Sequence, residues 1–557
     1  MQFSGAEIII KMLEKEGITV VSGIPGGANL PLYHALAKSS IRHVLTRHEQ
    51  GAGFIAQGMA RSTGKPAVCF VTSGPGATNL VTAIADAKAD SVPIIAITGQ
   101  VPTALLGTDA FQEVDMFGIT LPITKHNYLV RSAGELPRIM SEAFRIALSG
   151  RPGPVVIDVP KDVQLEQVEI QDWPAATTQE HPDIDEAALQ RIAALVNASQ
   201  RPVLYIGGGI VHAHAFEELR AFARRSSIPV ASTLLGLGCF PASDPLNLGM
   251  LGMHGAAATN FILQEADLLL ACGVRFDDRA TGNIAHFCPQ AKIVHIDIDP
   301  AEIGKNRRVD EGLAADIRIA LAELLPRILP DQRLVWGAFQ QEMRSRYQQA
   351  EPRDADMQHP RNIIRAVAEI VGLETIITTD VGQHQMWVAQ TYPFNVPRTL
   401  LTSGGLGTMG FGQPAGIGAA LANPGRRVVC FSGDGSILMN IQELATLAEL
   451  GLDVTVIIMN NGHLGMVRQQ QELFYQATYI ASRFESRPDF AAIARGFGLR
   501  GYDLGNTPQP RQLLATALRG SRPCVVNAPV RGEENVFPMV SPGAGNTRMI
   551  GFAPAAA

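Results

Sequence analysis

The sequence predicts an α/β protein of three doubly wound parallel-sheet domains, and three observations support that fold class. First, short apolar runs of strand length alternate with helix-like segments along the whole chain. Uninterrupted apolar strands of this kind are typical of parallel sheets that helices cover on both faces. Second, two polar, proline-containing stretches divide these runs into three series. Third, a length of 557 residues suits three or four domains of ~150 residues each.

The first series forms an expected N-terminal domain at residues 1–170. It opens with a helix, because Ser4 and Glu7 have the spacing of a capping box and apolar residues follow at helical intervals. A second helix is expected at 49–61. The strands are expected at 19–21, 43–46, 67–73 and 92–99 and within 152–163.

A polar segment at 171–188 is expected to be a linker, and the second series follows it in a central domain at 189–339. The strands of this domain are expected within 202–210, 229–234, 266–274 and 292–299. Gly207, Gly208 and Gly209 follow the first of these strands. Such a turn is typical of a close approach to phosphate, but it is a weak signal alone.

A second polar segment, 340–360, is expected to be another linker, and the third series forms a C-terminal domain at 361–557. Its strands are expected at 375–380, 428–435, 454–461 and 524–530, with a helix at about 438–450. The sequence contains no short-period repeat, which argues against a solenoid. The sequence therefore predicts three domains of similar construction.

Composition and charge exclude several function classes. The chain has 46 Lys and Arg against 52 Asp and Glu, a formal net charge of −6, with charged residues at 18%. This mildly acidic balance, without a basic run, predicts no nucleic-acid partner and no anionic membrane surface. No apolar run approaches the ~18 residues that a membrane helix needs, and the N-terminus lacks the layout of a signal peptide. The six scattered cysteines form no C-x-x-C pair, which predicts reduced thiols in a cytoplasmic protein.

Two oxygen-bearing side chains follow neighbouring strands of the third domain. Asp434 lies in a Gly-Asp-Gly turn, and Asn461 ends the next strand, about one βαβ unit of roughly 30 residues later. Because the carboxyl ends of parallel strands meet at one edge, both side chains are expected there. Carboxylate and amide oxygens beside a diphosphate suit Mg²⁺. For the Gly-Asp-Gly turn alone, an ordinary strand-to-helix turn capped by Asp434 remains the alternative.

Several further segments point in the same direction. They are RHEQGAGFIAQGMAR (47–61), SGPGATN (73–79), GTDAFQE (107–113), SGRPGPVVIDVPKD (149–162), GMLGMHG (249–255), VRFDDR (274–279), DVGQHQMW (380–387) and SGGLGTMGFG (403–412). With them, the chain resembles thiamin-diphosphate (ThDP) enzymes over its whole length, and within these the catalytic large subunits of acetohydroxyacid synthase, also called acetolactate synthase. The resemblance implies a pyrimidine-binding N-terminal domain, a central FAD-associated domain and a C-terminal domain that binds diphosphate and Mg²⁺.

The resemblance implies a transferase that acts on pyruvate. Such an enzyme decarboxylates pyruvate on ThDP and joins the two-carbon unit to a second pyruvate, giving 2-acetolactate, or to 2-ketobutyrate, giving 2-aceto-2-hydroxybutyrate. This is the first common step of branched-chain amino acid biosynthesis. The cofactor's own aminopyrimidine takes the proton, and a carboxylate on the ring nitrogen favours the form that can do so. By resemblance, Glu49 is that carboxylate; taken alone, it would be a first-turn glutamate favourable to the helix dipole.

The remaining cofactor residues are implied in the same way. Those that resemble ThDP-binding residues are Gln383, His384, Gly407, Met409, Gly435 and Ser436. Met409 resembles the apolar side chain that keeps ThDP bent, although a core methionine would need the same surroundings. The implied metal ligands are Asp434, Asn461 and the backbone oxygen of His463.

The substrate residues are also assigned by resemblance. Arg279 resembles the guanidinium that binds the carboxylate of the acceptor ketoacid, a role that suits a bidentate donor; an isolated RFDDR segment would more often be a solvated charge cluster. The other substrate positions are Phe111, Ala28, Met253, Met466, Val467 and Gln470. Gly27, Gln112 and Lys161 join Glu49 near the reaction centre.

A structural flavin is implied by the RFDDR segment at 275–279. Catabolic relatives lack this segment and the flavin, whereas in the biosynthetic enzymes FAD does not turn over. The residues implied for FAD are Arg151, Gly207, Gly208, Gly209, Thr233, Leu234, His254, Arg275, Asp277 and Asp297.

Two positions depart from the family pattern. Gln470 stands where most members have a tryptophan that contacts the extra methyl group of 2-ketobutyrate. One apolar contact of this size contributes ~1–3 kcal/mol to discrimination, so we expect weak 2-ketobutyrate preference. One bacterial isozyme type is similar in having this glutamine, and also Ile24. The other departure is Gln413, which has no functional explanation in the sequence.

Two alternatives remain open at this level. A pyruvate oxidase or a glyoxylate carboligase would share much of the pattern, but Glu49 argues against the carboligase, and Gln112 with RFDDR against the oxidase. A nucleotide-binding scaffold without catalysis would not need the family's reacting residues together. The resemblance further implies a homodimer or tetramer with active sites at the subunit interface, and a small regulatory subunit.

Overall fold

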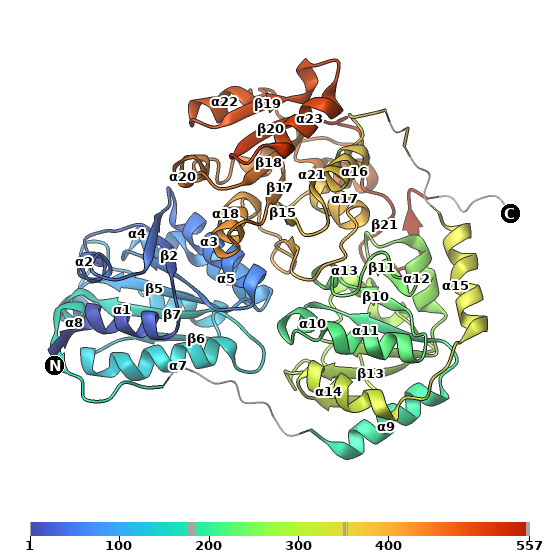
Figure 1. Cartoon of the computed structure of the whole chain (residues 1–557), viewed down its shortest axis with the longest axis horizontal. Coiled ribbons are helices and arrows are strands. Elements are labelled where there is room, and N and C mark those ends of the chain that lie inside the picture. The colour runs from blue at the N-terminus through green and yellow to red at the C-terminus, as the bar shows by residue number, and fades with distance from the viewer. Residues whose placement is uncertain (1, 176–183, 349–351, 354, 553–557) are drawn as a thin grey trace.

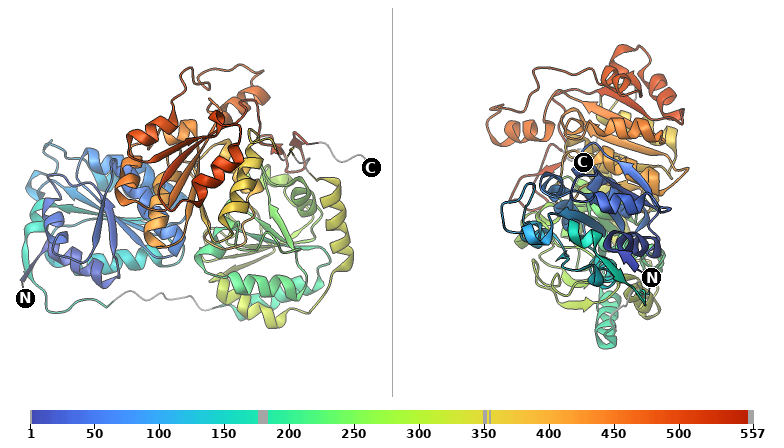
Figure 2. Two further views of the ribbon diagram at one scale, coloured as in Figure 1. Left: turned by 45° about the horizontal axis from the view of Figure 1, so that its top comes forward. Right: turned by 90° about the vertical axis from the view of Figure 1, so that its left-hand side faces the viewer.

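The predicted fold class is confirmed by the computed structural model, which describes residues 2–175, 184–348, 352–353 and 355–552. Three six-stranded sheets, parallel throughout, are each flanked by helices. Figure 1 shows them as three lobes, with the C-terminal one (orange to red) above the other two. Figure 2 shows the same arrangement from two further directions.

The N-terminal sheet has the strand order β3-β2-β4-β5-β7-β6. Its strands are β2 (Val20–Gly23), β3 (Arg42–Leu45), β4 (Ala67–Val71), β5 (Ile94–Gln100), β6 (His126–Leu129) and β7 (Val155–Pro160). Its helices are α1 (Gly5–Lys15), α2 (Leu30–Leu36), α3 (Glu49–Thr63), α4 (Pro75–Asn79), α5 (Val81–Ala89), α6 (Met116–Thr120), α7 (Leu136–Leu148) and α8 (Lys161–Leu165). The expected capping box is present, because Ser4 Oγ accepts from Glu7 N and the Glu7 carboxylate accepts from Ser4 N. A short antiparallel pair, β1 (Gln2–Ser4) with β8 (Gln167–Glu169), closes the domain.

The central sheet has the order β11-β10-β9-β12-β13-β14. Its strands are β9 (Pro202–Ile206), β10 (Val230–Ser232), β11 (Asn247–Met250), β12 (Leu268–Cys272), β13 (Lys292–Asp297) and β14 (Glu311–Ala314). Its helices are α9 (Glu186–Ala198), α10 (Gly208–His212), α11 (Phe216–Arg225), α12 (Ala257–Gln264), α13 (Asp278–Thr281), α14 (Ile317–Leu324) and α15 (Leu334–Arg346).

The C-terminal sheet has the order β16-β15-β17-β18-β20-β19. Its strands are β15 (Ile376–Thr379), β16 (Leu400–Leu401), β17 (Val428–Gly433), β18 (Val454–Asn460), β19 (Arg500–Asp503) and β20 (Cys524–Pro529). Its helices are α16 (Pro360–Val371), α17 (Gln383–Thr391), α18 (Gly412–Ala422), α19 (Asp434–Ile437), α20 (Glu443–Leu450), α21 (Gly465–Phe474), α22 (Phe490–Gly496) and α23 (Pro510–Arg519). A hairpin of β21 (Met539–Val540) and β22 (Met549–Ile550) follows.

The strand orders place a crevice in each sheet. Counted within its own domain, the order is 2-1-3-4-6-5 in the N- and C-terminal sheets and 3-2-1-4-5-6 in the central sheet. The latter is the order of dinucleotide-binding folds. In all three sheets, the connections diverge to opposite sides at one switch point. In such folds, ligands bind there, outside the carboxyl ends of the strands. The switch points lie between β2 and β4, between β9 and β12, and between β15 and β17.

The structure differs from the sequence-based expectations at several elements. Of the helix expected at 438–450, only 443–450 is helical, as α20; residues 438–442 form a turn, and the short helix α19 lies before the expected range. Helix α15 continues to Arg346 and so crosses the expected start of the second linker at 340. The first expected linker, 171–188, falls partly on residues outside the described ranges, and α9 begins inside it at Glu186.

A tight helix contact joins the N- and C-terminal domains within one chain. Gly58 of α3 packs on the backbone of Ala415 in α18, and Gly418 packs on the backbone of Ile55, so that a Cβ atom at either glycine would clash. Beside them, the rings of Phe54 and Phe411 meet edge to face at 5.4 Å. One apolar core therefore extends from α3 into α18 and the β17–β18 region. None of the helices in the described ranges is both long and apolar enough to span a membrane.

Candidate active site

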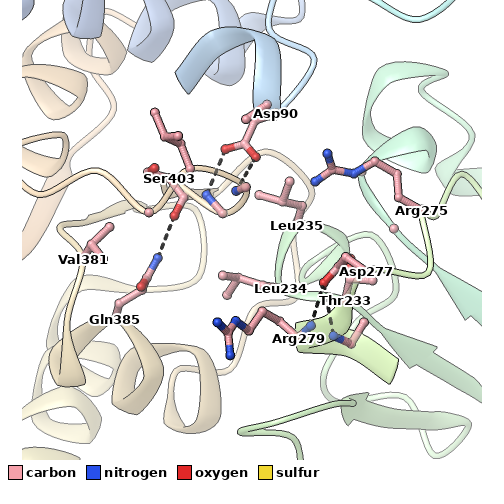
Figure 3. Close-up of a pocket in the computed structure, with 18 of the residues that line it drawn as sticks. Asp90, Thr233, Leu234, Leu235, Arg275, Asp277, Arg279, Val381, Gln385 and Ser403 are labelled. Atoms are coloured by element: carbon pink, nitrogen blue, oxygen red, sulfur yellow. Dashed lines mark hydrogen bonds between the residues drawn. The ribbon is translucent and has the colours of Figure 1, made fainter. Parts of the chain in front are cut away.

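A cavity of about 1080 Å³ lies where the three domains meet, lined mainly by the central and C-terminal domains. Its walls come from the carboxyl ends of strands at two switch points: β9 and β12 of the central sheet, and β15 and β17 of the C-terminal sheet. The end of α5 in the N-terminal domain adds Ala89, Asp90 and Ser91. Figure 3 shows side chains from all three lobes around it.

The cavity brings together every site residue that the sequence indicated in the central and C-terminal domains, and Arg151 of the N-terminal domain. Its lining includes the flavin positions Arg151, Gly207, Gly208, Gly209, Thr233, Leu234, His254, Arg275, Asp277 and Asp297. It also includes the ThDP, metal and substrate positions Gln383, His384, Gly407, Met409, Asp434, Gly435, Ser436, Asn461, His463, Met253, Arg279, Met466, Val467 and Gln470. One continuous space thus contains two predicted cofactor sites.

The predicted metal ligands lie at the ends of β17 and β18. The Asp434 carboxylate accepts hydrogen bonds from the backbone N–H groups of Gly462 (2.7 Å) and Gly435 (3.1 Å). Burial raises the pKa of Asp434 to about 6, although these hydrogen bonds oppose the shift. Asn461 Oδ1 accepts from the N–H of His463 at 3.0 Å. No three His, Cys, Asp or Glu side chains cluster as a metal site in the described ranges, so a cation here would rely on one carboxylate with amide and backbone oxygens, a set that suits Mg²⁺.

The ring of His384 lies between two glycines at the start of α17. A Cβ atom at Gly382 or Gly433 would come within 3.0 Å of the ring, so both positions need glycine for this packing. Burial lowers the pKa of His384 to about 3, which keeps the imidazole neutral. Its buried Nε2 has no hydrogen-bond partner among the described residues. A buried polar atom of this kind calls for an outside partner, and a diphosphate oxygen fits it.

Gln383 connects this site to the neighbouring helix. Its Oε1 accepts from Asn461 Nδ2 at 3.0 Å, while its Nε2 donates to Gln469 Oε1 and to the carbonyl of Glu534, each at 2.9 Å. Ser436 Oγ donates to the carbonyl of Val381 at 2.9 Å. These hydrogen bonds fix the ends of β15, β17 and β18 relative to one another.

The flavin side of the cavity is built on close backbone contact. Gly209 and Gly273, which follow β9 and β12, pack so tightly that a Cβ atom at either would clash with the other residue. Arg151 is held by Ser91 Oγ (2.8 Å) and by the Glu302 carboxylate (2.7 Å). Burial raises the pKa of Asp297 to about 6 at the end of β13.

Arg279 and His254 also line the cavity. Asp277 caps α13, accepting from the N–H groups of Arg279 and Ala280 at 3.2 Å each. The Arg279 guanidinium contacts Met253 Sδ at 3.5 Å and lies 3.8 Å from the Asp278 carboxylate, and its side chain is largely exposed. Burial lowers the pKa of His254 to about 4, so its ring is neutral. An exposed cation beside an apolar wall can bind the carboxylate of a small acid.

The six remaining predicted residues lie elsewhere, at the carboxyl edge of the N-terminal sheet. They are Gly27, Ala28, Glu49, Phe111, Gln112 and Lys161, and they are absent from the described lining of the cavity. Glu49, the first residue of α3, accepts from Asn79 Nδ2 at 2.9 Å. A Cβ atom built at Gly74 would lie 2.8 Å from the Gln112 carbonyl oxygen, and one built at Gly76 would lie 3.3 Å from Glu49 Oε1, so both predicted residues approach the same Gly-Pro-Gly turn. Phe111 is 88% exposed.

Sequence reasoning missed several residues that support the site. Asp380, fully buried at the end of β15, accepts from Gly410 N (2.7 Å), Gly412 N (3.2 Å) and Ser432 Oγ (2.7 Å). Asn79 and Gln469 were likewise not singled out. Asp380 and Asn79 lie inside quoted motifs, but their contacts join residues distant in sequence, which no local pattern reveals.

Comparisons with known proteins agree with this geometry. The family model for the N-terminal TPP binding domain of thiamine pyrophosphate enzymes matches residues 3–119 of the chain. The model of the central domain of thiamine pyrophosphate enzymes matches 189–324, and that of their C-terminal TPP binding domain matches 380–528.

Curated relatives are similar over nearly the whole chain. Acetolactate synthase isozyme 1 large subunit of Escherichia coli (strain K12) is 55% identical over 552 residues, which cover 99% of this chain and 98% of that protein. Acetolactate synthase large subunit of Parasynechococcus marenigrum (strain WH8102) is 48% identical, covering 99% and 91%. Acetolactate synthase isozyme 2 large subunit of Escherichia coli (strain K12) is 44% identical, covering 98% and 99%.

Proposed function

The chain belongs to the family of acetolactate synthase large subunits within the thiamine pyrophosphate enzymes, and from this membership we propose its reaction. It decarboxylates pyruvate and transfers the two-carbon unit to a second pyruvate or to 2-ketobutyrate. The observation that carries the proposal is the joint lining of one cavity by the predicted ThDP, metal and acceptor residues. In the same proposal, the domains extend over 1–170, 189–339 and 361–557.

Thiamin diphosphate, when bound, supplies the carbon that stabilises the negative charge left by decarboxylation. The chain's part is to hold and orient the groups around it. His384 Nε2 is buried and unpartnered among the described residues, and it would donate to a diphosphate oxygen in the tautomer that carries the ring proton on Nε2. Gln383 and Ser436 are anchored close by, and Met409 offers an apolar contact beside them. Glu49 would hold the aminopyrimidine nitrogen through a carboxyl hydrogen bond, and Gly27, Gln112 and Lys161 would border the reacting carbon.

Mg²⁺ is proposed at Asp434, Asn461 and the carbonyl of His463. Asp434 is a buried carboxylate whose two oxygens accept only backbone N–H groups in the hydrogen bonds described. A divalent cation would balance this charge and that of the diphosphate together. The metal therefore binds with the cofactor rather than before it.

A structural FAD is proposed for the other half of the cavity. The central sheet has the strand order of dinucleotide-binding folds, and the predicted flavin residues lie at its switch point and around it. The Gly209–Gly273 contact brings two backbones together where a dinucleotide approaches. Because the flavin does not turn over in this proposal, activity requires bound FAD but no change in its redox state.

The acceptor ketoacid is proposed to bind between the subsites. Arg279 would receive its carboxylate, and Met253, Met466 and Val467 would form the apolar wall around its alkyl group. Gln470 also lines this space. We propose that Gln470 gives the enzyme only a weak preference for 2-ketobutyrate over pyruvate.

The active site is proposed to form between two copies of the chain. Glu49 and its neighbours are outside the cavity of their own chain, yet the reaction needs them beside it. Large apolar side chains are exposed near both halves: Phe111 and Leu121 in the N-terminal domain, Met439 and Ile480 in the C-terminal domain. Because a contiguous exposed apolar patch marks a protein contact, we propose that these side chains belong to the surface that a second copy covers. A homodimer, or a tetramer of such pairs, would cover them.

Two further assignments belong to the same proposal. The Escherichia coli and Parasynechococcus relatives are named as large subunits, which implies a small regulatory subunit for this chain. The six cysteines are unpaired and buried, which supports the cytoplasmic, reducing compartment expected from the sequence.

The test of the function is a Glu49→Gln variant assayed for acetolactate with ThDP, Mg²⁺ and FAD. Glutamine keeps the size of the side chain and an oxygen for Asn79, so the fold and cofactor binding are expected to persist. Activity is expected to fall about 100-fold or more, because the carboxylate acts in the proton-transfer step. Near-normal activity in a variant that binds ThDP as the wild type does would overturn the assignment of Glu49. Failure of the wild type to form acetolactate from pyruvate would overturn the function itself.

A further inference from the structure

The loop 403–408 forms part of the cavity wall between the flavin side and the ThDP side. Its residues Gly404, Gly405, Leu406 and Gly407 are exposed to the cavity and to solvent. On the flavin side, Gly404 packs against Leu235, with a built Cβ atom 3.0 Å from the leucine side chain. A loop with three glycines has many accessible conformations and loses much entropy when it is fixed.

Asp86 of α5 holds both ends of this loop. Its Oδ1 accepts hydrogen bonds from Ser403 Oγ and from Thr408 Oγ1, the latter at 3.0 Å. Ser403 Oγ in turn accepts from the N–H of Thr408 at 2.8 Å, which closes the neck of the loop. Asp86 is fully buried and is not among the residues described as lining the cavity.

Asp90, one helical turn later, holds the middle of the loop. Its two carboxylate oxygens accept from the backbone N–H groups of Gly404 (2.9 Å) and Gly405 (2.7 Å). Figure 3 shows these two bonds as dashed lines below Asp90, beside the bond from Gln385 to the Ser403 carbonyl. The loop of the C-terminal domain is thus fastened to a helix of the N-terminal domain.

One arginine contacts both acids. Arg61 of α3 contacts Asp86 at 3.2 Å and Asp90 at 2.9 Å, and it donates to the carbonyl of Thr402 at 3.0 Å. Burial raises the pKa of Asp86, opposed mainly by Arg61. Burying two carboxylates with one guanidinium is unfavourable, and the hydrogen bonds that both carboxylates accept from the loop offset part of this cost.

We propose that Asp86 is a positioning residue for ThDP, which acts by holding the loop that presents Gly407 and Met409. This inference rests on the proposed function. A loop that is already ordered loses less entropy when the cofactor binds, so its affinity is higher. Asp86 touches neither the cofactor subsites nor the reacting groups, and it acts only through Ser403 and Thr408.

The test is calorimetric titration of ThDP, in excess Mg²⁺, into full-length Asp86→Asn protein loaded with FAD. Asparagine keeps the volume, but its NH2 group must replace either the oxygen that accepts from Ser403 and Thr408 or the oxygen that pairs with Arg61. The Arg61–Asp90 pair stays charge-balanced. The Kd for ThDP is expected to rise about tenfold, which matches the loss of a hydrogen bond to a charged group. The FAD content is expected to be unchanged.

A second variant, Thr408→Val, removes one hydroxyl at the loop neck without touching the described lining of the cavity. This variant is also expected to raise the Kd for ThDP. In the double variant, the two effects are expected to be less than additive, because both act on one contact. If Asp86→Asn protein does not fold, an unchanged Kd in Thr408→Val protein overturns the proposal by itself.

The matched control is Asp158→Asn in the same domain. Asp158 is equally buried and accepts from Thr98 Oγ1 (2.6 Å) and Gln100 Nε2 (3.0 Å), but its described contacts include none with the loop. This variant is expected to change the unfolding temperature without changing the Kd for ThDP. An Asp86→Asn protein that behaves like it has lost stability only, and the proposal fails. If wild-type protein does not bind ThDP, the proposed function fails instead.

Discussion

Three consecutive glutamines in α21 have three different surroundings. Gln469 is buried, where it accepts from Val536 N at 2.8 Å and donates to the Val536 carbonyl at 3.0 Å. Gln471 donates to the carbonyl of Ile480 and accepts from Ser482 Oγ. Gln470 is exposed and lines the cavity. The helical repeat of about 3.6 residues turns each side chain to a different face, so a change at Gln470 should act on the cavity alone.

We predict that Gln470→Trp raises the preference for 2-ketobutyrate over pyruvate about tenfold or more. An indole on the cavity wall would add apolar contact to the extra methyl group, and a methylene-sized contact discriminates by roughly that factor. The measurement is a competition assay in which both ketoacids are present at equal concentration and the two products are quantified. A strong 2-ketobutyrate preference already present in the wild type would contradict the role given to Gln470.

At the scale of residues, the sequence was informative where a function needs a particular side chain at a strand end. Asp434 and Asn461 follow neighbouring strands, so their meeting could be expected from topology alone. Asp86 and Asp380 could not be found in this way, because each holds a loop distant in sequence and neither has a distinctive neighbour pattern. The surroundings of Gln413 in α18 are buried, and nothing in the structure explains this glutamine.

At the scale of elements, the strands that the sequence missed in the three large sheets are edge strands. They are β6, β11, β14, β16 and β19, and each lies at the end of its sheet. Inner strands are buried on both faces and appear as continuous apolar runs. Edge strands are short and partly polar, as Arg500–Asp503 is, because exposed apolar edges would associate. Hydrophobic runs therefore predict every inner strand of the three sheets, whereas β3 is the only one of the six edge strands that they indicate.

The glycine turn after β9 allows a test of how β9 and β12 are held together, because its glycines differ in their surroundings. A Cβ atom at Gly209 would clash with the backbone of Gly273, whereas one at Gly208 would have no neighbour closer than the Leu235 side chain at 3.6 Å. We predict that Gly209→Ala lowers the free energy of unfolding by about 1–3 kcal/mol, as overpacking does, and lowers bound FAD with it.

Gly208→Ala is the control. It is expected to leave the unfolding temperature of the flavin-free protein nearly unchanged, because its Cβ makes an ordinary contact. The measurements are thermal unfolding without flavin and the flavin absorbance of the purified protein. Equal stability of the two variants would show that the Gly209–Gly273 approach does not hold β9 and β12 together.

At the scale of the whole molecule, each chain contains two incomplete halves of one proposed site. The C-terminal domain contributes Asp434 to the cavity, while the N-terminal domain presents Glu49 outside it. Within the chain, the N- and C-terminal domains are already joined by α3 and α18. A second copy related by two-fold symmetry would meet the same surfaces reciprocally, bringing the Glu49 of each chain to the cavity of the other.

This arrangement predicts complementation between two inactive variants. In a mixed dimer of Glu49→Gln and Asp434→Asn chains, one site combines both substitutions, while the other combines Glu49 of one chain with Asp434 of its partner. Random mixing makes half of the dimers mixed, each with one intact site, so about a quarter of the wild-type activity should return. The measurement is acetolactate formation after the two purified variants are dissociated together and reassociated. Sites built within single chains would give no activity in any mixture, because every chain carries one substitution, and that result would exclude a shared site.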